Sequence, residues 1–228
     1  MLRAITLLSG GLDSFISTAI ARKKHKVVLA LTFDYGQRAA RRELLATRKM
    51  CRMWHIPHKV IKLPWLARIT STSLVNRQRN VPKFSTYALT HLRTQALTAQ
   101  AVWVPNRNAL FINIGAAFAE TLHAQVIVTG FNKEEGVTFP DNSAMFVASI
   151  NKTLTLGTLE HWNTGAPVVS FVQQMTKKDM VRYALRHKLP LDICWPCYEG
   201  GRRLCGRCES CVRFFRALKC NHPSRSKG

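Results

Sequence analysis

Short β-branched and apolar runs alternate with longer helical stretches along most of this chain of 228 residues. The runs expected to be strands cover residues 3–8, 27–33, 58–62, 125–129 and 168–171. The stretches with helical periodicity cover residues 13–23, 37–54, 108–123, 143–156 and 177–188. In the second of these stretches we expect Leu44, Leu45 and Cys51 to face inward. Parallel strands need long crossover connections, for which helices are the usual solution. The pattern therefore predicts an α/β fold, a doubly wound parallel sheet with helices on both faces.

The first expected strand leads into a glycine turn, Ser9-Gly10-Gly11-Leu12-Asp13-Ser14, from which the first helix begins. Glycines allow the backbone to approach a phosphate closely, and free amides at a helix start hold negative charge. The turn is not a Walker loop or a dinucleotide fingerprint, because it has neither Gly-Lys-Ser/Thr nor Gly-x-Gly-x-x-Gly. It indicates a pyrophosphate site, and the alternative is a tight turn in which Asp13 only caps the helix.

Four further segments stand at the carboxyl ends of expected strands or at helix starts. They cover residues 32–38, 104–108, 130–142 and 176–179. Because ligands of a doubly wound sheet bind at this rim, we expect the four segments to converge on one site.

Charged side chains in these segments are candidates for ligand contacts. Asp34 is placed like an adenosine- or metal-binding acid, with a turn residue as the alternative. Arg38 and Arg107 suit a phosphate or a carboxylate, and the alternative for each is a plain surface arginine. Lys177 stands at a helix start, where a cation is unfavourable unless an anion lies nearby, so we expect a phosphate contact there.

Polar residues of the same segments are candidates for recognising a heterocyclic base. The Asp141 carboxylate can accept hydrogen bonds from amino and ring NH groups, and Glu134 and Glu135 either share that task or are solvated. Asn106 and Asn108 lie at the start of an expected helix, and we expect one of them to cap it.

Six of the seven cysteines fall within 27 positions near the end of the chain. In a chain expected to be cytosolic, such clustering indicates a metal site rather than disulfides. Cys197, Cys205, Cys208 and Cys211 offer four soft thiolates at spacings that suit a structural, tetrahedral zinc ion. Cys194, three residues upstream, is the alternative to Cys197 as a ligand.

The glycine turn resembles the pyrophosphate-binding loop of the PP-loop ATP pyrophosphatases. Together with the four segments and the cysteines, it makes nearly the whole chain resemble the QueC family of 7-cyano-7-deazaguanine (preQ0) synthases. The resemblance implies ATP as co-substrate, magnesium, a structural zinc ion, a deazapurine substrate with ammonia, and a homodimer. It implies two rounds of adenylation, in which an acid becomes an amide and the amide becomes a nitrile.

We assign roles to residues on this basis. The catalytic residues are Asp13 and Lys177. The ATP- and pyrophosphate-binding residues are Leu8, Ser9, Gly10, Gly11, Leu12, Asp13, Ser14, Asp34, Arg38 and Arg107. The substrate-binding residues are Asn106, Glu134, Glu135, Phe139 and Asp141, and the metal ligands are Cys197, Cys205, Cys208 and Cys211.

Length and pattern together predict the domain organisation. A nucleotide-binding domain is expected over residues 1–190, a zinc knuckle with a short helix over 191–219, and a basic tail over 220–228. Residues 63–104 are expected to form irregular structure or a lid, because prolines and hydroxyl residues interrupt any periodicity there.

The net charge of +22, from 34 Lys+Arg against 12 Asp+Glu, is the least expected feature. Such a charge attracts polyanions, although a solvated basic face is the plain interpretation. Three alternative functions are a PP-loop enzyme that adenylates a base within tRNA, a zinc-knuckle RNA binder, and a synthase relative redirected to another target. No apolar run approaches the about 20 residues of a membrane helix, so we expect a cytoplasmic protein with no membrane partner.

Overall fold

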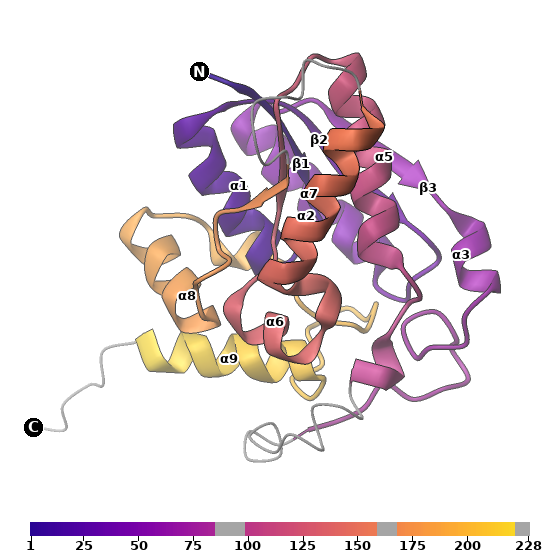
Figure 1. Cartoon of the computed structure of the whole chain (residues 1–228). Helices are drawn as coiled ribbons and strands as arrows, with labels where there is room; N and C mark the ends of the chain where they lie inside the picture. Colours follow the sequence, from indigo (N-terminus) through magenta and orange to yellow (C-terminus); the bar gives the residue numbers. More distant parts are fainter. Residues whose placement is uncertain (85–98, 159–167, 222–228) are drawn as a thin grey trace, which may run out of the picture.

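Five parallel strands form one sheet in the order β3-β2-β1-β4-β5. The computed structural model describes residues 1–84, 99–158 and 168–221 (Figure 1). The strands are β1 (Arg3–Leu7), β2 (Lys26–Asp34), β3 (His58–Lys62), β4 (Val126–Thr129) and β5 (Val168–Ser170). In the register of the sheet, Ile5 lies opposite Leu29 on one side and opposite Ile127 on the other.

Helices connect the strands and cover both faces of the sheet. They are α1 (Leu12–Lys24), α2 (Ala40–Trp54), α3 (Pro64–Arg68), α5 (Arg107–Thr121), α6 (Lys133–Thr138), α7 (Ala144–Gly157), α8 (Lys177–Arg186) and α9 (Glu209–Asn221). The single turns η2 (Pro140–Asn142) and η4 (Leu191–Ile193) are 3-10 helices. Strand order reverses between β1 and β4, which is the switch point where ligands of such sheets bind.

The two faces of the sheet bury separate hydrophobic cores. One core packs α1, α2, α8 and α9 together through Phe15, Met50, Met180 and Phe214. The ring of Phe15 stacks on that of Trp54, with centroids 4.9 Å apart. The other core packs α5 and α7 on the sheet and includes Ile5, Leu31, Ile112 and Ile150. The alternation of Ala30 and Leu31 between these cores follows the two-residue period of a strand.

The expected α/β fold class is confirmed, and each expected strand and helix is present with its ends moved by a few residues. The helix expected from residue 37 begins at Ala40, because Gln37 uses its side chain to close the preceding turn. Helices α3 and α6 were not expected, and α3 occupies the start of the stretch expected to be irregular. Residues 85–98 of that stretch, and residues 222–228 of the expected basic tail, lie outside the described residues.

Two local expectations are wrong. The expected inward position of Leu45 is not observed, since its side chain is 41% exposed and the buried positions of α2 are Ala46, Thr47, Met50, Cys51 and Trp54. Neither asparagine at the start of α5 caps that helix through its side chain. Asn106 adopts a left-handed backbone with φ of 54°, and Asn108 donates to the carbonyl of Asp141.

Gly130 provides a test of how tightly the sheet meets the first helix. A Cβ at this position would lie 2.6 Å from the backbone nitrogen of Ser14. We therefore expect Gly130→Ala to lower the free energy of unfolding by about 1–3 kcal/mol, the usual cost of overpacking. Gly157→Ala is the matched control, because a Cβ there meets nothing within 4 Å. Equal thermal midpoints for the two variants would contradict the close packing.

Candidate active site and metal centre

A cavity of about 260 Å³ opens at the carboxyl ends of β1, β2 and β4. The glycine turn forms part of its wall, together with the start of α5 and the segment that leads to the cysteines. This is the edge at which the sequence segments were expected to converge, and most of them do.

The glycine turn leaves the first amides of α1 available to a ligand. Gly10 has a φ of 84°, and a Cβ on it would lie 2.8 Å from the carbonyl oxygen of Glu43. Only glycine fits this position without strain. Gly11 is the N-cap of α1 and makes no side-chain capping bond. Ser9 and Ser14 place their hydroxyl oxygens 3.0 Å apart beside these amides. The start of α1 is therefore suited to hold an anion.

Asp13 does not cap the helix but pairs with Lys177. The Lys177 ammonium lies 2.5 Å from the Asp13 carboxylate and 2.8 Å from that of Glu135. Burial works to lower the pKa of Lys177, but the two carboxylates outweigh burial and raise this pKa above its ordinary value. Burial raises the pKa of Asp13 to about 6, against the pull of Lys177. At neutral pH the cluster thus holds one cation between two carboxylates.

A second set of ion pairs connects this cluster to the last helix. Asn132 caps α6 by accepting hydrogen bonds from the amides of Glu134 and Glu135, which orients both glutamates. Glu134 accepts a hydrogen bond from the backbone amide of Lys177 at 2.8 Å and another from Arg213 at 3.0 Å. Arg213 also donates to Glu209 at 2.8 Å. Helices α6, α8 and α9 are therefore joined by polar contacts beside the cavity.

The cavity wall also carries Arg107, Tyr35, Gln37 and Glu43. Arg107 donates to the hydroxyl of Tyr35 at 3.1 Å. Gln37 donates to the Glu43 carboxylate at 2.7 Å. Burial raises the pKa of Glu43 to about 7, which lets this carboxyl exchange a proton near neutral pH.

The predicted site residues fall into two groups. Those that line the cavity are Leu8, Ser9, Gly11, Leu12, Asp13, Ser14, Arg107, Glu135, Phe139 and Lys177. Those that do not line it are Gly10, Asp34, Arg38, Asn106, Glu134 and Asp141. Asp34 accepts a hydrogen bond from the Gly36 amide, and Arg38 pairs with Glu199 at 3.4 Å. The roles assigned to the residues of both groups stay predictions.

Sequence reasoning missed several residues of the cavity wall. Glu43 is the one acid between Arg38 and Arg79, and a single acid in a basic stretch is a pattern from which a site residue could have been predicted. Thr129 ends β4 at the ligand-binding edge, which was a second signal. Its hydroxyl oxygen and one carboxylate oxygen of Asp13 are buried without a hydrogen-bond partner among the described residues. Both atoms lie in residues of the cavity wall and are suited to contact a bound ligand.

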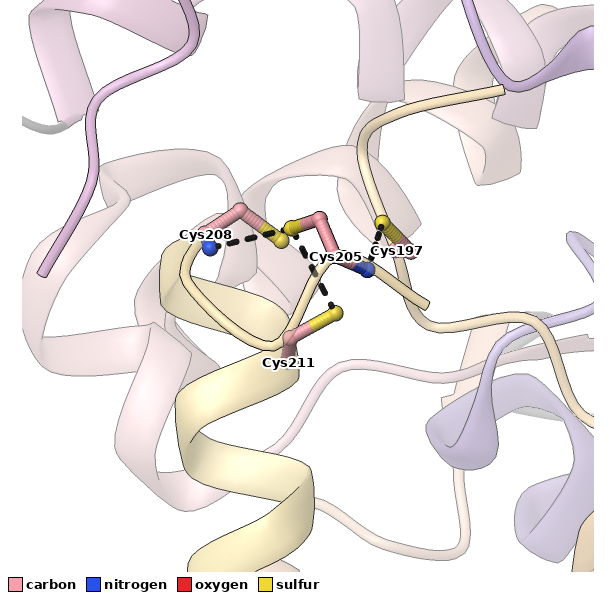
Figure 2. A group of neighbouring side chains, drawn as sticks. All are labelled: Cys197, Cys205, Cys208 and Cys211. Carbon is pink, nitrogen blue, oxygen red and sulfur yellow. Dashed lines mark hydrogen bonds between the residues drawn. The ribbon is translucent and has the colours of Figure 1, made fainter. Parts of the chain in front are cut away.

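The four predicted cysteines form one cluster, with their sulfur atoms within 4.8 Å of one another (Figure 2). Four sulfur atoms that each lie about 2.3 Å from a metal ion in a tetrahedron are about 3.8 Å from one another. A small inward movement of the four side chains therefore lets all four sulfur atoms bind one ion. The amides of Glu199 and Cys205 point at Cys197, and that of Cys208 points at Cys205. The donor set therefore fits a closed site for a thiophilic metal, with no open coordination position.

Cys194 is not part of this cluster within the described residues. It lies in the core that contains Phe214 and is 5% exposed. The next residue, Trp195, donates its backbone amide to the carbonyl of Gly10 at 2.8 Å. Pro196 and Tyr198 line the cavity. The segment that carries Cys197, the first cysteine of the cluster, is thus in direct contact with the glycine turn.

Arg213 tests the connection between α9 and the cavity. Replacing it with methionine leaves the buried Glu209 and its partner Glu134 without their cation. We expect Arg213→Met to cost about 3–5 kcal/mol of unfolding free energy, as for one partner removed from a buried pair. Arg182→Met is the control, because the Arg182–Asp179 pair is exposed and its loss costs below about 1 kcal/mol. Similar losses in denaturant unfolding of both variants would argue against the connection.

Comparison with known proteins identifies the family. The model of the family described as "Queuosine biosynthesis protein QueC" matches residues 3–222. The 7-cyano-7-deazaguanine synthase of Desulforamulus reducens is 45% identical over 217 residues, which are 95% of this chain and 93% of the relative. The synthase of Carboxydothermus hydrogenoformans is 46% identical, with 95% and 98% covered. That of Methanosarcina barkeri is 45% identical, with 96% and 94% covered.

A solved structure of a 4-thiouridine synthetase–RNA complex with bound ATP has a TM-score of 0.51 and is 16% identical to this chain. The match covers 96% of this chain and 50% of the other, and at that identity it shows the shared fold alone. Within the part of the chain that the structure describes, no helix has the length and apolar character needed to cross a membrane. From the match over residues 3–222 and the identities near 45%, the chain belongs to the QueC family of queuosine biosynthesis proteins.

Proposed function

We propose that the chain is an ATP-dependent 7-cyano-7-deazaguanine synthase that converts 7-carboxy-7-deazaguanine and ammonia into the nitrile preQ0. The observation that carries this proposal is the similarity near 45% over 95% of the chain to curated synthases. An uncapped helix start beneath a glycine turn, at the switch point of the sheet, supports it as a site for ATP.

The chemistry runs in two rounds. In the first, the substrate carboxylate attacks the α-phosphorus of ATP, pyrophosphate leaves, and ammonia displaces AMP to give the amide and a proton. In the second, the amide oxygen attacks another ATP, pyrophosphate leaves again, and loss of AMP and a proton gives the nitrile. Each round places its largest new charge on the departing pyrophosphate, so electrostatic stabilisation is the main task of the site.

The residues around the glycine turn meet that task. The amides of α1 and the hydroxyls of Ser9 and Ser14 hold the pyrophosphate. Lys177 keeps its proton throughout, because two carboxylates raise its pKa, so it stays a cation as charge develops nearby. The unpartnered oxygen of Asp13 fits one ligand position of magnesium, an ion that takes its other oxygens from water and phosphate. When bound, magnesium neutralises phosphate charge.

Recognition of the base falls to acidic residues in and beside the cavity wall. Glu135 and Phe139 line the cavity, and Asn106, Glu134 and Asp141 flank it on the same segments. Carboxylates accept hydrogen bonds from the amino and ring NH groups of a deazaguanine, and a phenyl ring packs on its face. Glu43 adds another buried carboxyl to the cavity wall. Its pKa near 7 suits it to take up a proton released during either round.

We assign the four-cysteine cluster to structural zinc and the enzyme to the cytoplasm. None of the seven cysteines forms a disulfide, which agrees with a reducing compartment. We further propose a homodimer. Val137, Met145 and Leu156 on α6 and α7 are more than 70% exposed and give apolar surface that a second copy can cover. The mass of the particle in solution tests the last point.

The reaction itself is tested with the purified chain, 7-carboxy-7-deazaguanine, ammonium, magnesium and ATP. We expect the nitrile, with about two AMP formed per base, measured by mass spectrometry and nucleotide chromatography. Asp13→Asn should lower the rate about 100-fold, the scale of losing one electrostatic contact in such a site. Asp192→Asn, an exposed acid outside the cavity, should not.

Other outcomes reject the proposal in distinct ways. An amide that goes no further would mean that the chain completes only the first round. AMP formed only when tRNA is present would favour adenylation of a base within tRNA. Equal loss of rate in both aspartate variants would remove Asp13 from the site.

Removal of the metal should loosen the last helix. Cys211 is fully buried at the start of α9, whereas Cys220 is exposed near the end of the same helix. We expect Cys211→Ser to lose its zinc, measured by elemental analysis, and to melt at lower temperature, because ligand binding contributes directly to folding. Cys220→Ser should keep about one zinc per chain and the original midpoint. Retention of zinc by the Cys211 variant would contradict the assigned ligand set.

A further inference from the structure

Three separated segments of the chain meet beside the metal centre. The guanidinium of Arg38, just before α2, donates to the carbonyls of Asn76 and Arg79. On α2, Arg42 donates to the carbonyl of Gly201 at 2.7 Å. The backbone amide of Phe84 donates to the carbonyl of Arg207 at 2.8 Å. Residues 76–84 and 199–207 and the start of α2 therefore form one continuous part of the molecular surface.

Exposed cations cluster on this surface, which we call the basic surface. It consists of the exposed side chains of Arg77, Arg79, Lys83, Arg202, Arg203 and Arg207. Among the described residues none of these six side chains forms an ion pair, and Glu199, the acid within residues 76–84 and 199–207, is already paired with Arg38. A protein that holds like charges together loses stability through their repulsion. The cluster therefore needs an explanation that the fold itself does not supply.

The proposed reaction does not account for the basic surface. None of its six residues lines the cavity, where the proposed reaction assigns the phosphates of ATP to the glycine turn and Lys177. Its neighbours do line the cavity, however. Trp195, whose ring lies 5.1 Å from the Arg42 guanidinium carbon, and Ala39, next to Arg38, are both wall residues. The basic surface thus lies next to the active site but outside it.

The chemistry of the basic surface selects one class of partner. Five of its six cations are arginines, whose planar guanidinium groups bind phosphate oxygens in pairs. Exposed Gln78 and Asn80 alternate with the arginines, and such amides hydrogen-bond sugars and base edges. A lipid surface would instead favour exposed apolar residues among the cations, and residues 76–80 contain none.

The local structure further favours RNA over DNA. The six cations lie on turns and loops, and none lies on a helix or strand that is long enough to enter a major groove. Irregular loops with arginine and amide side chains suit the uneven backbone and 2′-hydroxyls of folded RNA. We propose that the basic surface binds the phosphate backbone of a folded RNA beside the active-site cavity.

The test is fluorescence anisotropy of a labelled RNA hairpin with the full-length, zinc-loaded protein. We expect binding that weakens steeply between about 50 mM and about 200 mM salt. The double variant Arg77→Glu, Arg79→Glu should bind at least about tenfold more weakly and show a shallower salt dependence by about two phosphate contacts. A DNA hairpin of the same sequence should bind more weakly than the RNA.

A matched control separates position from total charge. Lys152→Glu with Arg186→Glu makes the same charge change at exposed residues of α7 and α8. We expect this control to bind RNA as the unaltered protein does. Equal weakening in both double variants would reduce the inference to an effect of net charge and overturn it. Equal affinity for DNA, or no RNA binding at the lower salt concentration, would overturn it as well.

This inference is independent of the proposed reaction, and the two fail separately. Arg77 and Arg79 lie outside the cavity, so their double variant should keep its thermal midpoint, its zinc and its rate of nitrile formation. Loss of RNA binding with those properties intact supports the basic surface. A lowered thermal midpoint or a loss of zinc together with the loss of RNA binding would instead indicate misfolding. In that case the double variant Arg202→Glu, Arg203→Glu is the deciding one. If this variant is folded and still binds RNA as the unaltered protein does, the proposal is overturned.

Discussion

The buried ammonium of Lys177 is the interaction on which the rest of the site depends. A cation with a 5% exposed side chain is costly unless carboxylates surround it, and Asp13 and Glu135 do so from α1 and α6. Through its backbone amide the same residue holds Glu134, which in turn holds Arg213 on α9. One desolvated charge therefore fixes four helices at the carboxyl edge of the sheet, and the glycine turn takes its position among them.

The metal centre supports this arrangement from the other side. Cys211 lies in the first turn of α9 and Arg213 follows two residues later, so a metal ion held by the four cysteines would also set the start of the helix that reaches Glu134. The segment before Cys197 is joined to the glycine turn by the hydrogen bond from Trp195 to Gly10. A site with four thiolate ligands has no position for substrate, but its geometry determines the wall of the cavity.

Patterns local in sequence predicted most of the fold and part of the site. Periodicity or spacing within a few residues is enough to predict the strands, the main helices, the glycine turn and the four cysteines. The partners of Lys177 do not, because Asp13 lies 164 residues away and Glu135 lies 42 residues away, and only the folded sheet brings them together. The predictions for Leu45 and Asn106 were wrong for a related reason. Tertiary packing leaves Leu45 exposed although the helix pattern indicates an inward position. A left-handed backbone at Asn106 accompanies the missing side-chain cap that its residue type favours.

The charge of the cavity is opposite to that of the protein. With a net +22 overall, the chain lines its cavity with three acids, Asp13, Glu43 and Glu135, against two bases, Arg107 and Lys177. A triphosphate that enters such a cavity gains little from these side chains alone, so the uncharged amides of α1 are the groups of the chain best suited to hold its charge. Burial lessens the conflict by raising the pKa values of Glu43 and Asp13 toward neutrality. The excess positive charge therefore resides on the outer surface, outside the cavity that takes the small substrates.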